Sequence, residues 1–189
     1  MLTAVRAAWA RLDAAPLRAA IGRAAEAGPW AARSAARGVA LPCGSLRLDG
    51  HLKVNPMSGA VFAGGHPLDL GPEARPTDWL VQAFPSRLRL KTVCPLWYGA
   101  EASERALAQE ALPRAIALHR IAPKAEALIS LPLGRLSCVQ EAIAAGAFGT
   151  TPVRVHAWDK VIEARTIVTV PRPSKDDVEE AATRLAACG

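Results

Sequence analysis

The stretch LRLKTVCPLWYGAEASERALAQEALPRAIAL, residues 88–118, predicts a β-strand followed by a long α-helix, with a cysteine at their junction. Leu88, Leu90 and Thr92 alternate along the strand and would share one of its faces. A cysteine at the start of a helix is prone to react, because the helix N-terminus stabilises its thiolate. Trp97 stands three residues after Cys94, where a second thiol would be needed to resolve a mixed disulfide. The stretch therefore predicts a strand–cysteine–helix unit without the dithiol of a working oxidoreductase.

Length and composition favour one domain with an extension. The chain has 189 residues, 51% of them hydrophobic, and a net charge of +6, and domains usually run to about 100–150 residues. No stretch approaches the roughly 20 unbroken apolar residues of a membrane-spanning helix, so we expect a protein that does not itself span a membrane. The charge is compatible with RNA or anionic lipid, but it lacks the Lys/Arg blocks typical of nucleic-acid-binding proteins.

The four cysteines lie far apart and show no zinc-ligand spacing. They are Cys43, Cys94, Cys138 and Cys188. A chain with this much apolar sequence needs no disulfide framework, and we expect buried, reduced thiols. A Cys94–Cys138 bridge is compatible with the sequence but is not supported by spacing alone.

Residues 1–40 are rich in arginine and alanine and poor in acids. Leu2, Val5, Trp9 and Leu12 recur at helical spacing. Amphipathic, Arg-rich, acid-poor segments are typical of mitochondrial import, so residues 1–40 are interpreted as an import-like segment or as an arm that the protein retains. The alternative is an ordinary surface helix in a protein of a high-GC bacterium or phage.

Residues 41–85 are dominated by proline and glycine, with short apolar runs between them. SLRLDGHLKV, residues 45–54, predicts a small hairpin about Asp49–Gly50, a dipeptide that favours tight turns. AVFAGGHPL, residues 60–68, predicts a short strand that ends at a turn. We therefore expect residues 41–85 to form an extended arm, ordered by the surface on which it lies.

Residues 86–189 have the pattern of an α/β domain. The first strand, at 87–93, is followed by a helix at 100–122 that Pro113 should kink or restart. The later elements are a strand at 125–131, a short helix at 135–146, two strands facing each other at 152–158 and 163–170, and a final helix capped by Ser174. The predicted order is β-α-β-α-β-β-α.

This order, together with particular segments, resembles a mitochondrial thioredoxin-like family. The segments are LKTVC, GAEASER, ALPRAIAL, AEALISL after a proline, AGAFG, and RTIVTVPRPSKDDVEEAATRL. The family includes an accessory subunit of respiratory complex I, NADH dehydrogenase alpha-subcomplex subunit two, and two mitochondrial ribosomal proteins. The resemblance covers roughly residues 87–189. It implies a thioredoxin-like sheet with flanking helices, preceded by a helical and extended N-terminal arm.

The chain departs from the family pattern in three places. The family's Ser-Ser-Arg-Gly-like helix start is only loosely matched by ASER, residues 102–105. The insertion FGTTPVRVHAW is longer than the family pattern, and the residues before 86 have no counterpart in it.

No pattern in the sequence predicts a catalytic centre, a cofactor or a metal. The histidines are scattered singly, without a second ligand at metal spacing; they are His51, His66, His119 and His156. The acids at 176, 177, 179 and 180 have a structural explanation, since acids in the first turns complement the helix dipole. We therefore expect Cys94 and Cys138 to be non-catalytic thiols.

These observations predict a non-catalytic accessory subunit of a large mitochondrial assembly, on the matrix side, with neighbouring subunits as its partners. Respiratory complex I and its electron-transport chain come first, because the positive charge is modest for a protein that lies on RNA. The closest alternative is a mitochondrial ribosomal protein, in which Arg87, Arg89 and Lys91 would meet rRNA phosphates. A phage tail-completion protein and an active single-cysteine oxidoreductase are the further alternatives.

Overall fold

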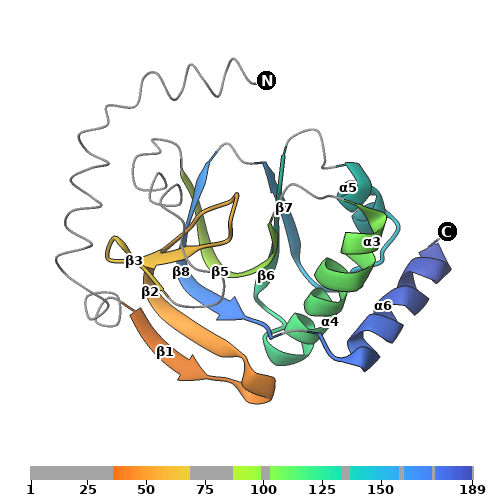
Figure 1. The fold of residues 1–189 in the computed structure, drawn as a ribbon, viewed down its shortest axis with the longest axis horizontal. Coiled ribbons are helices and arrows are strands. Elements are labelled where there is room, and N and C mark those ends of the chain that lie inside the picture. The colour runs from red at the N-terminus through yellow and green to blue at the C-terminus, as the bar shows by residue number, and fades with distance from the viewer. Residues whose placement is uncertain are drawn as a thin grey trace, which may run out of the picture.

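The computed structural model describes residues 36–68, 87–98, 103–132, 137–157, 160–171 and 173–188. They form an α/β structure in which the helices lie together on one side of a curled, mixed sheet (Figure 1). The predicted α/β class is thus confirmed. Most of the predicted import-like segment, residues 1–35, lies outside the described residues, as do residues 69–86.

Eight strands form one sheet within the described ranges. They are β1 (Ala36–Ala40), β2 (Leu46–Val54), β3 (Val61–Ala63), β4 (His66–Pro67), β5 (Arg87–Tyr98), β6 (Glu126–Leu131), β7 (Val153–Ala157) and β8 (Val161–Thr169). Their order is β4-β3-β2-β8-β5-β6-β7, with β1 also paired to β2. The pairs β8–β5, β5–β6 and β6–β7 are parallel, whereas the pair β2–β8 is antiparallel.

The N-terminal strands correct the prediction of an extended arm for the described part of residues 41–85. Strand β2 pairs along its length with β8, and its Leu48, Leu52 and Val54 are buried. The predicted hairpin at Asp49–Gly50 is wrong, because β2 runs through this pair and only a register shift interrupts its pairing there. Burial of the leucines and valine against β8 outweighs the turn preference of the dipeptide.

The sequence predicts a short strand that ends at a turn in residues 60–68, and the structure has β3 there; the chain then returns as β4 to make a short hairpin. The two residues between them, Gly64 and Gly65, both have positive φ, 58° and 85°. A two-residue turn of this kind matches the twist of the strands, and glycine adopts it without steric cost.

Strands β7 and β8 exist where predicted, but the expectation that they face each other is wrong. Strand β7 pairs with β6, and β8 lies between β2 and β5. Ala157 at the end of β7 pairs with Leu131 of β6, which lies one residue past the partner of Tyr98, the last residue of β5. Val161 at the start of β8 pairs with Arg87, the first residue of β5. In a flat sheet these two levels would be about 40 Å apart, yet four residue steps span at most about 14 Å.

The sheet therefore curls, and β5 provides the bend. Its pairing with β6 shifts register between Pro95 and Trp97, and a proline inside a sheet is found at such irregularities. One buried cluster runs across four successive strands and contains Leu48 of β2, Ile167 of β8, Val93 of β5 and Leu128 of β6.

The helices follow the predicted order. They are α3 (Glu104–Ala106), the π-helical segment η3 (Leu107–Ala111), α4 (Leu112–Ile121), α5 (Ser137–Ala144) and α6 (Lys175–Cys188), and a short 3₁₀ turn, η1 (Pro42–Gly44), joins β1 to β2. Pro113 lies in the first turn of α4, directly after the π-helical segment, as a residue without a backbone N–H should. Gly146, with φ of 81°, follows α5 as predicted.

Two buried apolar clusters stabilise this arrangement. The first lies between the helices and the sheet and contains Cys94, Leu96, Leu112, Leu118 and Ile129. The second joins β2, β3, β5, β6 and β8, including Val93 and Leu128. Because neighbouring residues of β5 and β6 fall into different clusters, both faces of these strands are covered over this part of their length.

Candidate functional site

Cys94 lies inside β5 and not at the start of a helix. The strand continues to Tyr98, and the first helical residue after it in the described part of the chain is Glu104. The Cys94 side chain is fully buried among the residues beneath the helices. The predicted position at a strand–helix junction is therefore wrong, and the stabilisation that a helix N-terminus gives to a thiolate is absent at this residue.

The surroundings of Cys94 favour the neutral thiol. Burial raises the pKa of Cys94 to about 12, against the opposing effects of the Arg114 charge and of a hydrogen bond from the Val170 backbone. Desolvation penalises the charged form, so the thiolate that nucleophilic or disulfide chemistry requires is disfavoured at neutral pH.

The other cysteines do not complete a redox pair with Cys94. All four are free thiols, so the structure holds no Cys94–Cys138 bridge. Cys138 is half-buried on α5, whereas Cys43 and Cys188 are exposed. The Cys188 thiol donates a hydrogen bond to the Ala145 carbonyl at 3.1 Å.

The histidines stay as scattered as the sequence predicts. His119 of α4 lies 3.3 Å from the Thr150 hydroxyl, His156 of β7 lies 3.0 Å from the Lys160 carbonyl, and His51 lies 3.9 Å from Glu163. Within the described ranges, no three histidine, cysteine or acidic side chains gather into a group that could hold a metal ion. The same residues contain no helix long and apolar enough to cross a membrane.

Ser130 and His156 are the one serine–histidine pair that the sheet brings level, on β6 and β7. Both are buried, and the Ser130 hydroxyl has no hydrogen-bond partner. The Nε2 atom of His156 is instead engaged with the Lys160 carbonyl. Since a nucleophile and its base must lie within hydrogen-bond reach, this arrangement does not make a nucleophile of Ser130.

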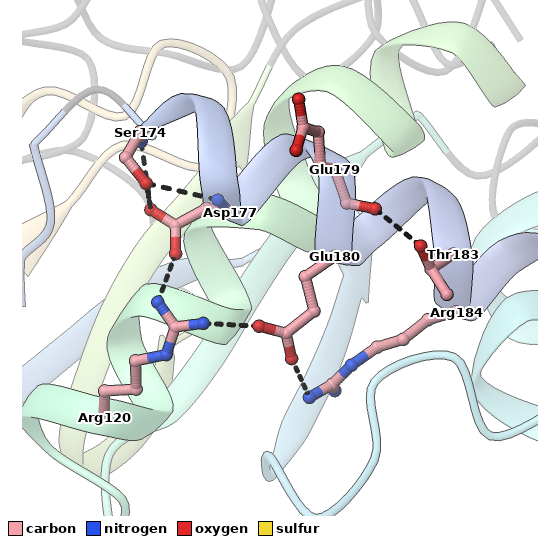
Figure 2. Close-up of polar contacts among 7 residues, drawn as sticks. All are labelled: Arg120, Ser174, Asp177, Glu179, Glu180, Thr183 and Arg184. Carbon is pink, nitrogen blue, oxygen red and sulfur yellow. Dashed lines mark hydrogen bonds and ion pairs between the residues drawn. The ribbon is translucent and has the colours of Figure 1, made fainter.

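A network of polar side chains joins α4 to α6 (Figure 2). Ser174 and Asp177 cap α6 reciprocally: the Asp177 N–H donates to the Ser174 hydroxyl at 3.1 Å, and the Ser174 N–H donates to the Asp177 carboxylate at 2.9 Å. Arg120 of α4 donates to Asp177 at 2.7 Å and also to Glu180. Arg184 donates to the other Glu180 oxygen at 2.6 Å.

This helix-side network, which comprises Arg120, Ser174, Asp177, Glu180 and Arg184, has a structural role. The buried carboxylate of Asp177 is satisfied by the cap and by Arg120, as a buried charge must be. The predicted Ser174 cap is confirmed. Each acid is engaged by cations of the same protein, so the network fixes α4 on α6.

The strands carry a second charged group. Arg89 and Lys91 of β5 are both exposed. On β8, Arg165 is exposed between the buried Ala164 and Thr166. We call Arg89, Lys91 and Arg165 the basic strand face; Arg87 begins the same strand, but its side chain lies outside the description.

One acid lies beside the basic strand face. Glu163 of β8 is 5% exposed, is level with Lys53 and Arg89 on the neighbouring strands, and accepts a hydrogen bond from Arg89 at 3.2 Å. Among the described residues, neither Lys91 nor Arg165 forms an ion pair. Two cations at the centre of this face are therefore not neutralised.

Sequence reasoning found Arg89 and Lys91 but not Arg165. The signal for Arg165 is the alternation of EARTIVTV, in which Glu163 and Arg165 share one face; its proximity to Lys91 depends on the pairing of β8 with β5. Comparison of the chain with family models, with curated proteins and with solved structures finds no match.

Proposed function

We propose that this protein is a non-catalytic structural subunit of a large mitochondrial assembly, and that respiratory complex I is the first candidate. The observation that carries the proposal is the state of Cys94. The thiol that the resemblance places at a redox position is buried in the core, and its pKa is raised to about 12. Thiol exchange by this residue is disfavoured. The role proposed for its domain is therefore contact with neighbouring subunits.

The described surface offers such contacts. Four of the five residues of β1 are exposed, and among the described strands only β2 pairs with it. At the other end of the sheet, no described strand pairs with the outer edge of β7. Open strand edges present unpaired N–H and C=O groups that a neighbouring chain can extend.

The thioredoxin-like relationship is part of the proposal and rests on the sequence resemblance. The parallel β5–helix–β6 unit supports it. The separation of β7 from β8 is the main point at which the sheet departs from the pattern expected from the sequence.

The test is to fractionate detergent-solubilised mitochondria of the source organism that carry a tagged copy of the chain. Stoichiometric migration of the tag with NADH dehydrogenase activity on a native gel supports the first candidate. Recovery of the chain as a free monomer, or its absence from mitochondria, would refute the proposal.

The mitochondrial ribosome is the second candidate, and the basic strand face favours it. Lys91 and Arg165 are exposed and have no acid partner among the described residues, so they suit phosphate contacts, which dominate protein–RNA affinity. A ribosomal subunit would sediment with rRNA particles at low salt and be stripped from them at high salt, without NADH dehydrogenase activity in its fractions.

A further inference from the structure

We propose that the basic strand face, Arg89, Lys91 and Arg165, is a binding surface for the phosphate backbone of RNA. The choice of RNA among polyanions rests on the second candidate function, and the surface itself is assigned from its geometry. All three side chains are exposed, and they lie on the adjacent strands β5 and β8.

The register of the strands places the three cations close together. Leu90 pairs with Ala164 and Thr92 with Thr166, so Lys91 and Arg165 are level on adjacent strands, about 4.8 Å apart at the backbone. Arg89 lies two residues before Lys91 on β5, at about 7 Å. Both arginines therefore lie within about 7 Å of Lys91 at the backbone.

The charges on this face complement a polyanion. Arg89 shares the buried Glu163 carboxylate at 3.2 Å but keeps 84% of its side chain exposed. Lys91 and Arg165 have no acid partner among the described residues, unlike the helix-side cations. A guanidinium binds phosphate through a planar fork of donors, and an ammonium binds it as a point charge.

The composition of the face indicates which part of RNA it contacts. The face is defined by two guanidinium groups and one ammonium group, whose charge matches phosphates. Binding through these groups should be insensitive to sequence and sensitive to salt. A membrane surface fits less well, because peripheral binding also needs apolar side chains to insert, and the exposed large apolar residues among those described, Val39 and Met57, lie on other segments.

The experiment compares the full chain with a triple variant, Arg89→Gln, Lys91→Gln and Arg165→Gln. The probe is a fluorescent single-stranded RNA of about 20 nucleotides, titrated between about 50 and 200 mM KCl, with fluorescence anisotropy as the readout. Each phosphate contact contributes about 0.7 to the slope of log K against log salt for single strands. The triple variant should therefore have a slope shallower by about 2 and an affinity on the order of 100-fold lower at 0.1 M salt.

The matched control removes three charges from the helix-bearing part of the chain: Arg105→Gln, Lys124→Gln and Lys175→Gln, all exposed. For this control, the slope of log K against log salt should lie closer to the wild-type slope than to the slope of the triple variant. An equal loss in both variants would show a general charge effect and overturn the proposal. If the triple variant fails to fold by circular dichroism, Lys91→Glu alone replaces it and should lower the affinity more than Lys124→Glu.

Further arms identify the ligand. Tighter binding to duplex DNA of the same length, or to vesicles containing phosphatidylglycerol, than to the RNA would overturn the assignment to RNA. A triple variant that still sediments with rRNA particles and binds RNA normally refutes the surface while the ribosomal function stands. If the triple variant loses RNA binding as expected but the wild-type chain is absent from ribosomes, the binding surface is supported and the ribosomal function is refuted.

Discussion

On the helix side of the molecule, Arg120 and Arg184 are each held by acids of α6, whereas on the open face of β5 and β8 Lys91 and Arg165 project without an acid partner among the described residues. The two groups have the same charge but different surroundings. Arg120 ties a buried carboxylate, 8% exposed, to a neighbouring helix. The cations of the basic strand face contact water.

This difference separates charges that serve folding from charges that are available for binding. A buried carboxylate costs free energy unless it is paired and hydrogen-bonded, so Asp177 requires Arg120. An exposed cation has no such requirement, and the stability of the protein changes little whether or not the cation forms an ion pair. Stability measurements should therefore respond to the first group, and anion-binding measurements to the second.

The largest effect is expected from Asp177→Ala. This change removes the cap of α6 and leaves Arg120 without its buried partner, so the free energy of unfolding should fall by about 2–3 kcal/mol. Urea denaturation followed by circular dichroism measures it. The control is Asp176→Ala in the same helical turn, where the side chain is exposed and the loss should stay below about 0.5 kcal/mol.

Equal losses in the two aspartate variants would mean that helix-dipole interactions alone account for both residues. The helix-side network would then add nothing to the fold, and the contrast with the basic strand face would disappear.

The Cys94 thiol provides the next largest effect, in alkaline solution. Its pKa in the folded protein, about 12, lies above the value of about 8.5 expected in the unfolded chain. Its contribution to stability is therefore complete below about pH 8.5 and is lost as the pH rises toward 12, by about 1.4 kcal/mol per pH unit. The free energy of unfolding, measured by urea denaturation at pH 8.5 and 10, should differ by about 2 kcal/mol, and Cys94→Ala should remove most of that difference.

Thiol labelling checks the same residue independently. In the native protein, an aromatic disulfide reagent should react rapidly with the exposed Cys43 and Cys188 and should reach Cys94 only after unfolding. Rapid labelling of Cys94 at neutral pH would contradict its buried, neutral state and reopen the oxidoreductase alternative.

Local pattern was sufficient to predict most of the elements. The stripe of Leu107, Ala111, Leu112, Ala115 and Leu118 is buried as helical spacing requires, and Ser174 caps its helix. Both features depend on residues within a few positions of each other, and such features can be read from a sequence.

The pairing of strands could not be predicted in the same way. Asp49–Gly50 has the chemistry of a tight turn, but burial of Leu48 and Leu52 against β8, more than a hundred residues away, keeps β2 extended. The short link between β7 and β8 suggested a hairpin, and the bend of β5 provides another solution. The position of Cys94 was misjudged for a related reason, since Cys94 and Leu96 find burial beneath the helices and β5 continues past them.

A smaller effect is expected where β2 meets β8. The Thr166 hydroxyl donates to the Asp49 carboxylate at 2.7 Å and lowers its pKa, with a further contribution from Arg47. Thr166→Val should cost about 1 kcal/mol at neutral pH. Because the folded-state pKa is lowered, this stabilisation is present above about pH 4 and is lost as the pH falls through the folded value. The variant should therefore differ less from the wild type in acid, and a constant difference down to pH 2 would contradict the role of Asp49.

The smallest effect on stability is expected at the basic strand face itself. Two unit charges about 6 Å apart in water repel each other by roughly 0.7 kcal/mol before salt screening, so Lys91→Gln or Arg165→Gln should leave the free energy of unfolding within about 0.5 kcal/mol of the wild type. Arg120→Gln, which removes one charge of the same sign from the helix-side network, should cost more than either variant. If Lys91→Gln or Arg165→Gln destabilised the protein as strongly as Arg120→Gln, the strand-face cations would be part of the folded structure and would not be free to bind phosphate.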